Sequence, residues 1–225
     1  MKKIIIIALI GLVVSFLTVE ALLSEETVTS GTMSLEAVMD RVEARYAGPG
    51  FSVRFLQTST LKAMEITDTA TGSIFVKRPG MMRWEYETPT TQVIVADSKD
   101  LWIYRPEDNQ VMHGAAPAFF GGGKGAGFLS DITRIRKDFD VSLDKPDSAG
   151  NPRVKLIPKN KTFDVATIYL TLAGATFEIT TLVTLNTFGD ETRFELIDYQ
   201  FNQTFFPSLF QFVVPEGAQV LTLDQ

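Results

Sequence analysis

The strongest constraint on the fold is a period-two alternation of apolar and polar side chains that recurs in short runs from residue 51 onward. Phe51, Val53 and Phe55 begin the pattern, and residues 73–77 and 82–86 continue it. Because side chains of a β-strand point alternately to its two faces, each run predicts a strand with one face against a core. Turn-forming residues separate the runs at intervals of about 8 to 12 residues, which is typical of an antiparallel meander.

The same pattern predicts strands along most of the chain. In three runs, at 51–56, 101–104 and 205–214, apolar side chains occupy both the odd and the even positions. A strand with only one buried face does not need apolar side chains on both faces. The expected strands lie near residues 51–56, 73–77, 82–86, 93–96, 101–104, 109–113, 138–144, 152–158, 165–172, 176–186, 191–201 and 209–214.

Two segments have helical spacing instead. A helix is expected from Ser34 to about Ala47, because its apolar residues recur on one face and Gly48-Pro49-Gly50 ends it. A second, short helix is expected from Phe128 to about Arg136, directly after the glycine-rich run Gly121–Gly127. A glycine hinge before an amphipathic helix suits a movable lid. A loop followed by a packing helix is the alternative.

The N-terminus has the pattern of a secretory signal. Met1-Lys2-Lys3 is followed by an apolar run, Ile4–Val19, and by small residues around Ala21. We therefore expect a signal peptide at 1–21 rather than an uncleaved anchor, a flexible lead-in at 22–32 and one domain at 33–225. The dilysine start indicates a bacterial protein, and its expected compartment is the periplasm.

Composition excludes several classes of function. The formal charge of −6 and the pI near 4.9 argue against binding to nucleic acid or adsorption to anionic lipid. The chain has no cysteine and one histidine, His113, so thiol chemistry and a histidine-rich metal site have no residues to use. Gly121–Gly127 lacks the phosphate-loop sequence, because Lys124 is followed by Gly125. No group of residues indicates an enzyme, a cofactor or a metal.

A family resemblance appears between residues 72 and 111. Gly72–Tyr86 reads GSIFVKRPGMMRWEY and Gln92–Tyr104 reads QVIVADSKDLWIY. Phe51-x-x-x-Phe55-x-Gln57 precedes them, and Phe210-x-Phe212-x-x-Pro215-x-Gly217 follows near the end. In this order the motifs resemble those of the outer-membrane lipoprotein carrier family, LolA, over residues 33–220. The sequence departs from the family at Ser98-Lys99-Asp100, where D-G-K is usual, and in the glycine content of 121–127.

The resemblance implies a fold and a role. The fold would be mainly β with short helices: a curved, incompletely closed antiparallel half-barrel, with an α-helical lid over its concave face. The cavity would hold the acyl chains of lipoproteins during transfer from the inner to the outer membrane. The implied partners are acylated lipoproteins, an inner-membrane lipoprotein-releasing ABC transporter and a LolB-like outer-membrane receptor, with the carrier itself a monomer.

The resemblance also assigns site residues. It places Arg78, of Lys77-Arg78-Pro79, at the contact between sheet and lid, as a latch that bonds lid carbonyl groups. The alternative for Arg78 is an exposed arginine at a strand end. Strand parity and helix spacing predict the cavity lining: Phe55, Met82, Trp84, Trp102, Leu129 and Ile132.

Other functions stay open at this point. A glycolipid carrier, or the lipid-sensing domain of an envelope-stress regulator, would use the same half-barrel. The receptor LolB shares the fold but requires an acylated cysteine, which this chain lacks. A periplasmic hydrolase and a purely structural interaction module are the remaining alternatives.

Overall fold

The computed structural model describes residues 33–97, 99–116, 127–161 and 164–223. The expected signal peptide (1–21), the lead-in (22–32) and most of the glycine-rich run lie outside these residues. Met33–Gln225 forms one compact unit. In the described residues, no helix has the length and apolar character needed to cross a membrane.

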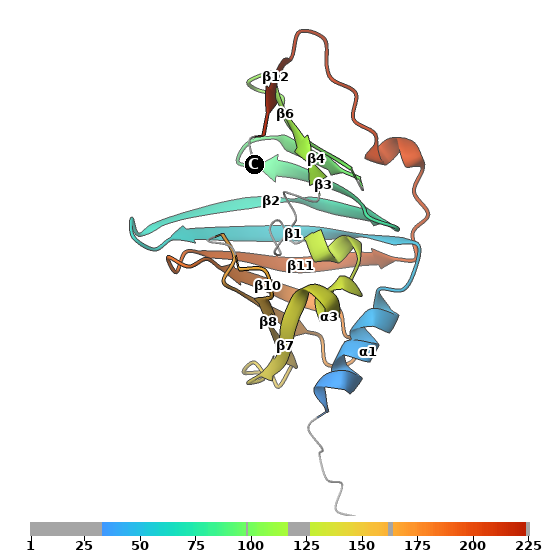
Figure 1. The fold of residues 1–225 in the computed structure, drawn as a ribbon, viewed down its shortest axis with the longest axis vertical. Helices are drawn as coiled ribbons and strands as arrows, with labels where there is room; N and C mark the ends of the chain where they lie inside the picture. The colour runs from blue at the N-terminus through green and yellow to red at the C-terminus, as the bar shows by residue number, and fades with distance from the viewer. Residues whose placement is uncertain (1–32, 98, 117–126, 162–163, 224–225) are drawn as a thin grey trace, which may run out of the picture. The chain divides into compact units, whose positions relative to one another are not determined.

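The core of this unit is a twelve-stranded, unclosed sheet (Figure 1). Its strand order is β12-β6-β5-β4-β3-β2-β1-β11-β10-β9-β8-β7, so that β12 and β7 form the two edges of the described sheet. The strands are β1 (Gly50–Leu61), β2 (Ile66–Lys77), β3 (Met81–Thr88), β4 (Gln92–Ala96), β5 (Asp100–Arg105), β6 (Gln110–Ala115), β7 (Phe139–Asp144), β8 (Arg153–Pro158), β9 (Thr167–Leu172), β10 (Ile179–Leu185), β11 (Glu191–Phe201) and β12 (Gln219–Thr222).

Register aligns the apolar side chains into rows across the sheet. Val53 of β1 lies opposite Ile74 of β2, which lies opposite Trp84 of β3. The row continues through Ile94 and Ile103 of the next two strands. Directly paired residues point to the same face, so this register gives the sheet one continuous apolar inner face.

Helical segments cover that inner face (Figure 1). Helix α1 (Leu35–Arg45) begins where the sequence predicts, and the backbone N–H of Ala37 donates to Oγ of the N-cap Ser34 at 3.2 Å. Helix α3 (Arg134–Asp138) follows a 3₁₀ turn at 127–130. We call residues 127–138 the lid segment. Its apolar side chains and those of α1 join the strands in one buried cluster.

The C-terminal segment differs from the expected strand at 209–214. Residues Pro207–Phe210 form a 3₁₀ helix, η2, and the chain then runs without regular structure to β12. Pro207 and Pro215 lack the N–H group that a ladder requires, which disfavours a strand here. Strand β12, which the sequence did not predict, pairs parallel with β6, so the sheet is mixed rather than purely antiparallel.

Candidate functional site

The inner face of the sheet brings five of the six predicted lining residues together. Phe55, Met82 and Trp84 come from β1 and β3, and Leu129 and Ile132 come from the lid segment. All five side chains are at most 3% exposed and belong to the same apolar cluster. The sequence therefore identified residues of one shared interior.

Trp102 is the residue that the structure does not bring to this cluster. It lies on β5 between Leu101 and Ile103, which point inward, so its own side chain points to the outer face. There its ring stacks on His113 with centroids 3.8 Å apart and on Phe212 at 5.5 Å. Nε2 of His113 also contacts Oδ1 of Asp100 at 2.9 Å. Trp102 therefore belongs to the packing of the C-terminal segment on the outer face.

Trp84 lies at the centre of an aromatic group on the inner face. The rings of Phe55, Tyr86 and Phe194 lie within 5.4 to 6.4 Å of its own ring. Gly72 makes this arrangement possible, since a Cβ at that position would lie 2.8 Å from the Phe55 ring and 2.0 Å from the Glu85 carbonyl oxygen. Most of these rings meet at a steep angle, and the group offers an apolar surface suited to hydrocarbon chains.

The lid segment is not the single helix that the sequence predicts. Ahead of α3 its hydrogen bonds are of the shorter i to i+3 type, from Asp131 N to the Phe128 carbonyl and from Ile135 N to the Ile132 carbonyl. Oδ1 of Asp131 accepts from both the backbone N–H and the hydroxyl of Thr133. These local bonds compete with an α-helix and divide the segment into two turns. Phe128, Leu129, Ile132 and Ile135 nevertheless all point into the core.

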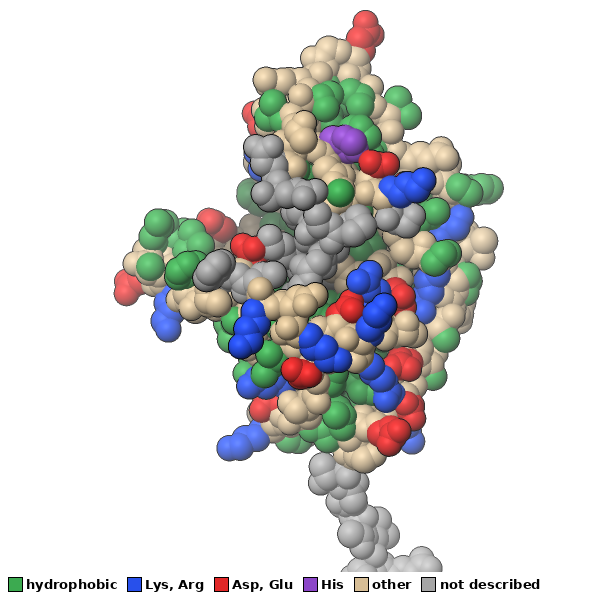
Figure 2. Space-filling model, viewed as in Figure 1, with side chains coloured by type: hydrophobic (Ala, Val, Ile, Leu, Met, Phe, Trp, Pro, Cys, Tyr) green, Lys and Arg blue, Asp and Glu red, His purple; other side chains and the backbone are tan. Residues whose placement is uncertain are grey.

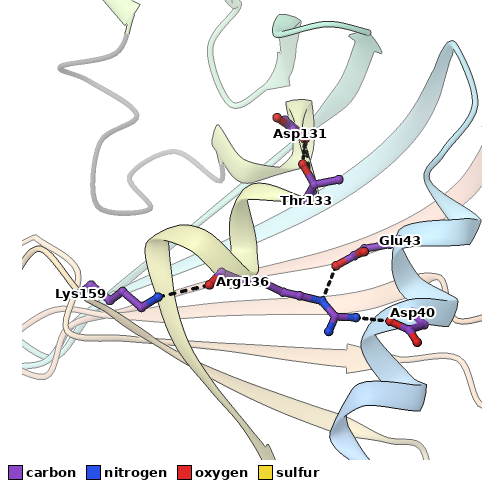
Figure 3. A network of polar contacts seen from close by, with 6 residues as sticks. All are labelled: Asp40, Glu43, Asp131, Thr133, Arg136 and Lys159. Atoms are coloured by element: carbon purple, nitrogen blue, oxygen red, sulfur yellow. Dashed lines mark hydrogen bonds and ion pairs between the residues drawn. The ribbon is translucent and has the colours of Figure 1, made fainter.

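Arg136 ties the lid segment to α1 (Figure 3). Its Nε donates to Oε1 of Glu43 at 2.6 Å, and its Nη2 forms an ion pair with Asp40. Lys159 Nζ donates to the Arg136 carbonyl oxygen at 3.2 Å and to that of Lys137 at 3.0 Å, at the end of α3. The two carboxylates raise the pKa of Arg136, with the hydrogen bond to Glu43 contributing most. Charged side chains of both signs gather over this region in Figure 2.

Sequence reasoning did not find the Arg136 contacts. Arg136 and Glu43 are 93 positions apart, and each sits among other charged residues in the sequence. The available signal was the position of Arg136, which lies one residue from the inward-facing Ile135 near the end of a predicted helix.

Tyr46 fixes the C-terminal end of α1 to the sheet. Its buried hydroxyl donates to Tyr199 Oη at 3.0 Å and accepts from the backbone N–H of Ile179 at 3.0 Å. Tyr199 in turn donates to the Ile179 carbonyl oxygen at 2.9 Å. Burial raises the pKa of Tyr46 to about 12 and that of Tyr199 well above its usual value. Helix α1 is therefore fixed to the sheet, and the lid segment contacts it through Arg136.

Arg78 lies just after the end of β2, and its backbone N–H donates to the Pro49 carbonyl oxygen at 2.9 Å. Burial lowers the pKa of its guanidinium, while the carboxylate of Asp131 and the hydroxyl of Tyr46 act in the opposite direction. Its Nε and Nη2 are buried and have no hydrogen-bond partner in the part of the chain that the structure describes. Arg78 thus has unused donors, and the carboxylate of lid residue Asp131 favours its charged form.

The described residues contain no cluster of three or more His, Cys, Asp or Glu side chains that could hold a metal ion. The chemistry of the inner face is therefore that of aliphatic and aromatic side chains, with the donors of Arg78 at its margin.

Comparison with known proteins gives consistent matches. The family model for outer membrane lipoprotein carrier protein LolA matches residues 49–213. An outer-membrane lipoprotein carrier protein of Nitrosomonas europaea is 32% identical over 175 residues, which cover 76% of this chain and 82% of the relative. One from Nitrosospira multiformis is 30% identical over 203 residues, covering 89% and 93%. An uncharacterized conserved protein from Thermus thermophilus shares the fold, with a TM-score of 0.54 at 14% identity, covering 84% of this chain and 98% of that one.

Proposed function

The chain belongs to the LolA family of outer-membrane lipoprotein carrier proteins, and we propose that it holds the acyl chains of its cargo between the inner face of the sheet and the lid segment. Members of this family are carriers, so the protein is a transport protein and not an enzyme. The observation that carries the proposal is the set of four buried lid side chains that belong to the same apolar cluster as Phe55, Trp84 and Phe194 of the aromatic group.

The free energy of packing the lid side chains is the main cost of opening the lid segment. Burial of Phe128, Leu129, Ile132 and Ile135 stabilises the closed form by about 1.5–3 kcal/mol for each side chain. A net hydrogen bond contributes only about 1 kcal/mol. Apolar contact, rather than the polar latch alone, therefore holds the empty carrier closed.

Cargo changes this balance because an acyl chain offers the lid segment the same kind of contact. When hydrocarbon enters beneath the lid segment, the four side chains exchange protein neighbours for methylene groups. The free energy of burying these side chains is then nearly the same in the empty and the loaded forms. The difference between empty and loaded forms then depends on the smaller polar terms at Arg78 and Arg136. A carrier needs this arrangement, since it must both bind and release a very apolar molecule.

Arg78 is the residue that we assign to release. Its two unpaired, buried donors make the closed form less stable than complete pairing would, and the carboxylate of Asp131 in the lid segment favours its charged form. Movement of the lid segment changes the surroundings of this charge, so Arg78 couples the position of the lid segment to the presence of cargo.

The transport route is part of the same proposal. The signal-like residues 1–21 support export to the periplasm. The carrier, as a monomer, would receive lipoproteins from an inner-membrane releasing transporter of the ABC class. It would then deliver them to a LolB-like receptor at the outer membrane.

Photocrosslinking in the source organism tests the proposal. A benzophenone amino acid at Ile132, a fully buried residue of the lid segment, should capture acylated lipoproteins that mass spectrometry identifies. The matched control is Ile157 of β8, which is 39% exposed next to the inward-facing Leu156. Adducts of a glycolipid, or no lipid-bearing adduct at Ile132, would contradict the proposal.

A further inference from the structure

The described part of the chain buries four side-chain polar atoms without a hydrogen-bond partner: Nε of Arg45, Nε and Nη2 of Arg78 and Nε1 of Trp84. Every one of them is an N–H donor. Unused donors without unused acceptors among the buried side-chain atoms of the described residues are complementary to a ligand that supplies acceptors only.

Trp84 differs from the two arginines in its surroundings. Its side chain is 3% exposed, whereas the guanidinium of Arg45 already pairs with Glu178. The indole N–H is the only polar atom of the side chain and donates a single hydrogen bond. Trp84 lies opposite Ile74 and Ile94 in the middle of the sheet, on the face where we place the acyl chains.

The neighbouring polar groups are already paired with one another. Tyr86 Oη donates to Oε1 of Gln57 at 2.9 Å, and Nε2 of Gln57 donates to Oγ of Ser59 at 2.9 Å. This chain of hydrogen bonds satisfies the tyrosine and the amide without using Trp84. The indole N–H is therefore free to donate a hydrogen bond to a group that does not belong to the described residues.

We propose that Nε1 of Trp84 donates a hydrogen bond to the ester carbonyl oxygen of a bound acyl chain. This inference rests on the proposed function. An ester-linked acyl chain carries its strong acceptor at one end and hydrocarbon beyond it, so this bond fixes how far the chain enters beneath the lid segment. It also gives the carrier a preference for acyl esters over hydrocarbon of equal length, which apolar packing alone does not provide.

Paired synthetic ligands test this preference. The probes are two glyceryl-cysteine peptides, one with two palmitoyl ester chains and one with two hexadecyl ether chains, compared in the same detergent. The full chain should bind the ester about 5- to 10-fold more tightly, the effect of one net hydrogen bond. Trp84→Phe keeps an aromatic ring and removes the donor, so it should bind the two probes equally. Trp102→Phe, on the outer face, should keep the ratio of the wild type.

The outcomes separate the two proposals. Failure of the wild type to bind either probe contradicts the proposed function. Equal, tight binding of both probes by the wild type, or an ester preference that Trp84→Phe retains, overturns the role of the indole N–H alone.

A spectroscopic measurement avoids dependence on the Trp84 variant. Because the chain has two tryptophans, Trp102→Phe leaves Trp84 as the only indole. Ultraviolet resonance Raman bands that report on the indole N–H should indicate no hydrogen bond in the empty protein, and a new one with the ester probe but not with the ether. An N–H that is already hydrogen-bonded in the empty protein overturns the inference.

Discussion

Nε of Arg136 donates to Oε1 of Glu43 at 2.6 Å and so joins the lid segment to α1 across 93 positions of sequence. Helix α1 is itself anchored to the sheet through Tyr46, which makes Glu43 a fixed point for the lid segment. The contact is partly exposed, with Arg136 at 38% and Glu43 at 28%. It can therefore bias the position of the lid segment without determining whether the domain folds.

Removing this contact should loosen the lid segment more than the domain. We expect Arg136→Ala to lower the free energy of unfolding by about 0.2–1 kcal/mol, because exposed ion pairs contribute little. Hydrogen exchange of residues 127–138 should accelerate, while exchange in β1 and β2 stays unchanged. The control is Arg134→Ala, whose partner Asp138 lies within the lid segment itself. Equal acceleration in both variants would show that the contact with α1 has no particular role.

Arg78→Leu should separate uptake from delivery. The variant still presents the apolar inner face and should bind lipoprotein, but a leucine replaces the buried, unpaired guanidinium with a further apolar contact for the acyl chains, so cargo should leave more slowly. The measurement is transfer of a labelled lipoprotein from the loaded carrier to outer-membrane vesicles. Arg105→Leu, at an exposed strand end, is the control. Delivery by Arg78→Leu at the rate of the wild type would exclude the release role.

Truncation of a buried lid side chain should weaken both stability and cargo binding. We expect Ile132→Ala to lower the free energy of unfolding by about 2–4 kcal/mol, since it removes packed methylene groups and leaves a cavity. Binding of the ester probe should weaken as well, because the lid segment then offers less contact to the chain. Urea unfolding and probe titration measure the two effects. Ile157→Ala should change neither by more than about 0.5 kcal/mol.

Stability should fall at alkaline pH through Tyr46. The pKa of its hydroxyl is about 12 in the folded protein and 10.0 as the ordinary value, so between these values the unfolded chain releases the proton first. The free energy of unfolding therefore decreases as pH rises through this window, by about 1.4 kcal/mol for each pH unit from this group. Below pH 10 this group has little effect.

Tyr46→Phe provides the comparison for the alkaline slope. At about pH 8 the variant should be less stable by about 1–3 kcal/mol, because the N–H of Ile179 loses its acceptor. Its stability should then depend less steeply on pH between 10 and 12. An identical slope in the two proteins, measured by urea unfolding, would rule out Tyr46 as a source.

Alternation of apolar and polar residues predicted the inward-facing side chains correctly only in strands that have one apolar face. Parity places Phe55, Met82 and Trp84 inside because their alternate neighbours are mostly polar. At 101–104 every residue is apolar, so parity does not distinguish the inner from the outer face. Contact with Phe212, more than a hundred positions away, gives Trp102 an apolar outer surface.

The lid segment illustrates a second limit. The spacing of Phe128, Leu129, Ile132 and Ile135 predicts a face, and all four side chains are buried as that face requires. The same spacing also fits two shorter turns, which the bonds between Asp131 and Thr133 favour. A hydrophobic pattern predicts which residues are buried. The backbone conformation depends in addition on hydrogen bonds from nearby polar side chains, which compete with those of an α-helix.

The sequence alone determined the mainly β architecture, the position of α1, the inward-facing side chains of β1 to β3 and, through its ordered motifs, the family, because alternation and motif order are local properties of a chain. Only the tertiary structure decided the outward position of Trp102, the parallel pairing of β12 with β6, the tie between Arg136 and Glu43 and the unpaired N–H of Trp84. Each of these depends on which distant groups come into contact. Whether a hydrogen bond forms depends on two groups that the fold brings together. The pattern around one residue in the sequence does not identify its distant partner.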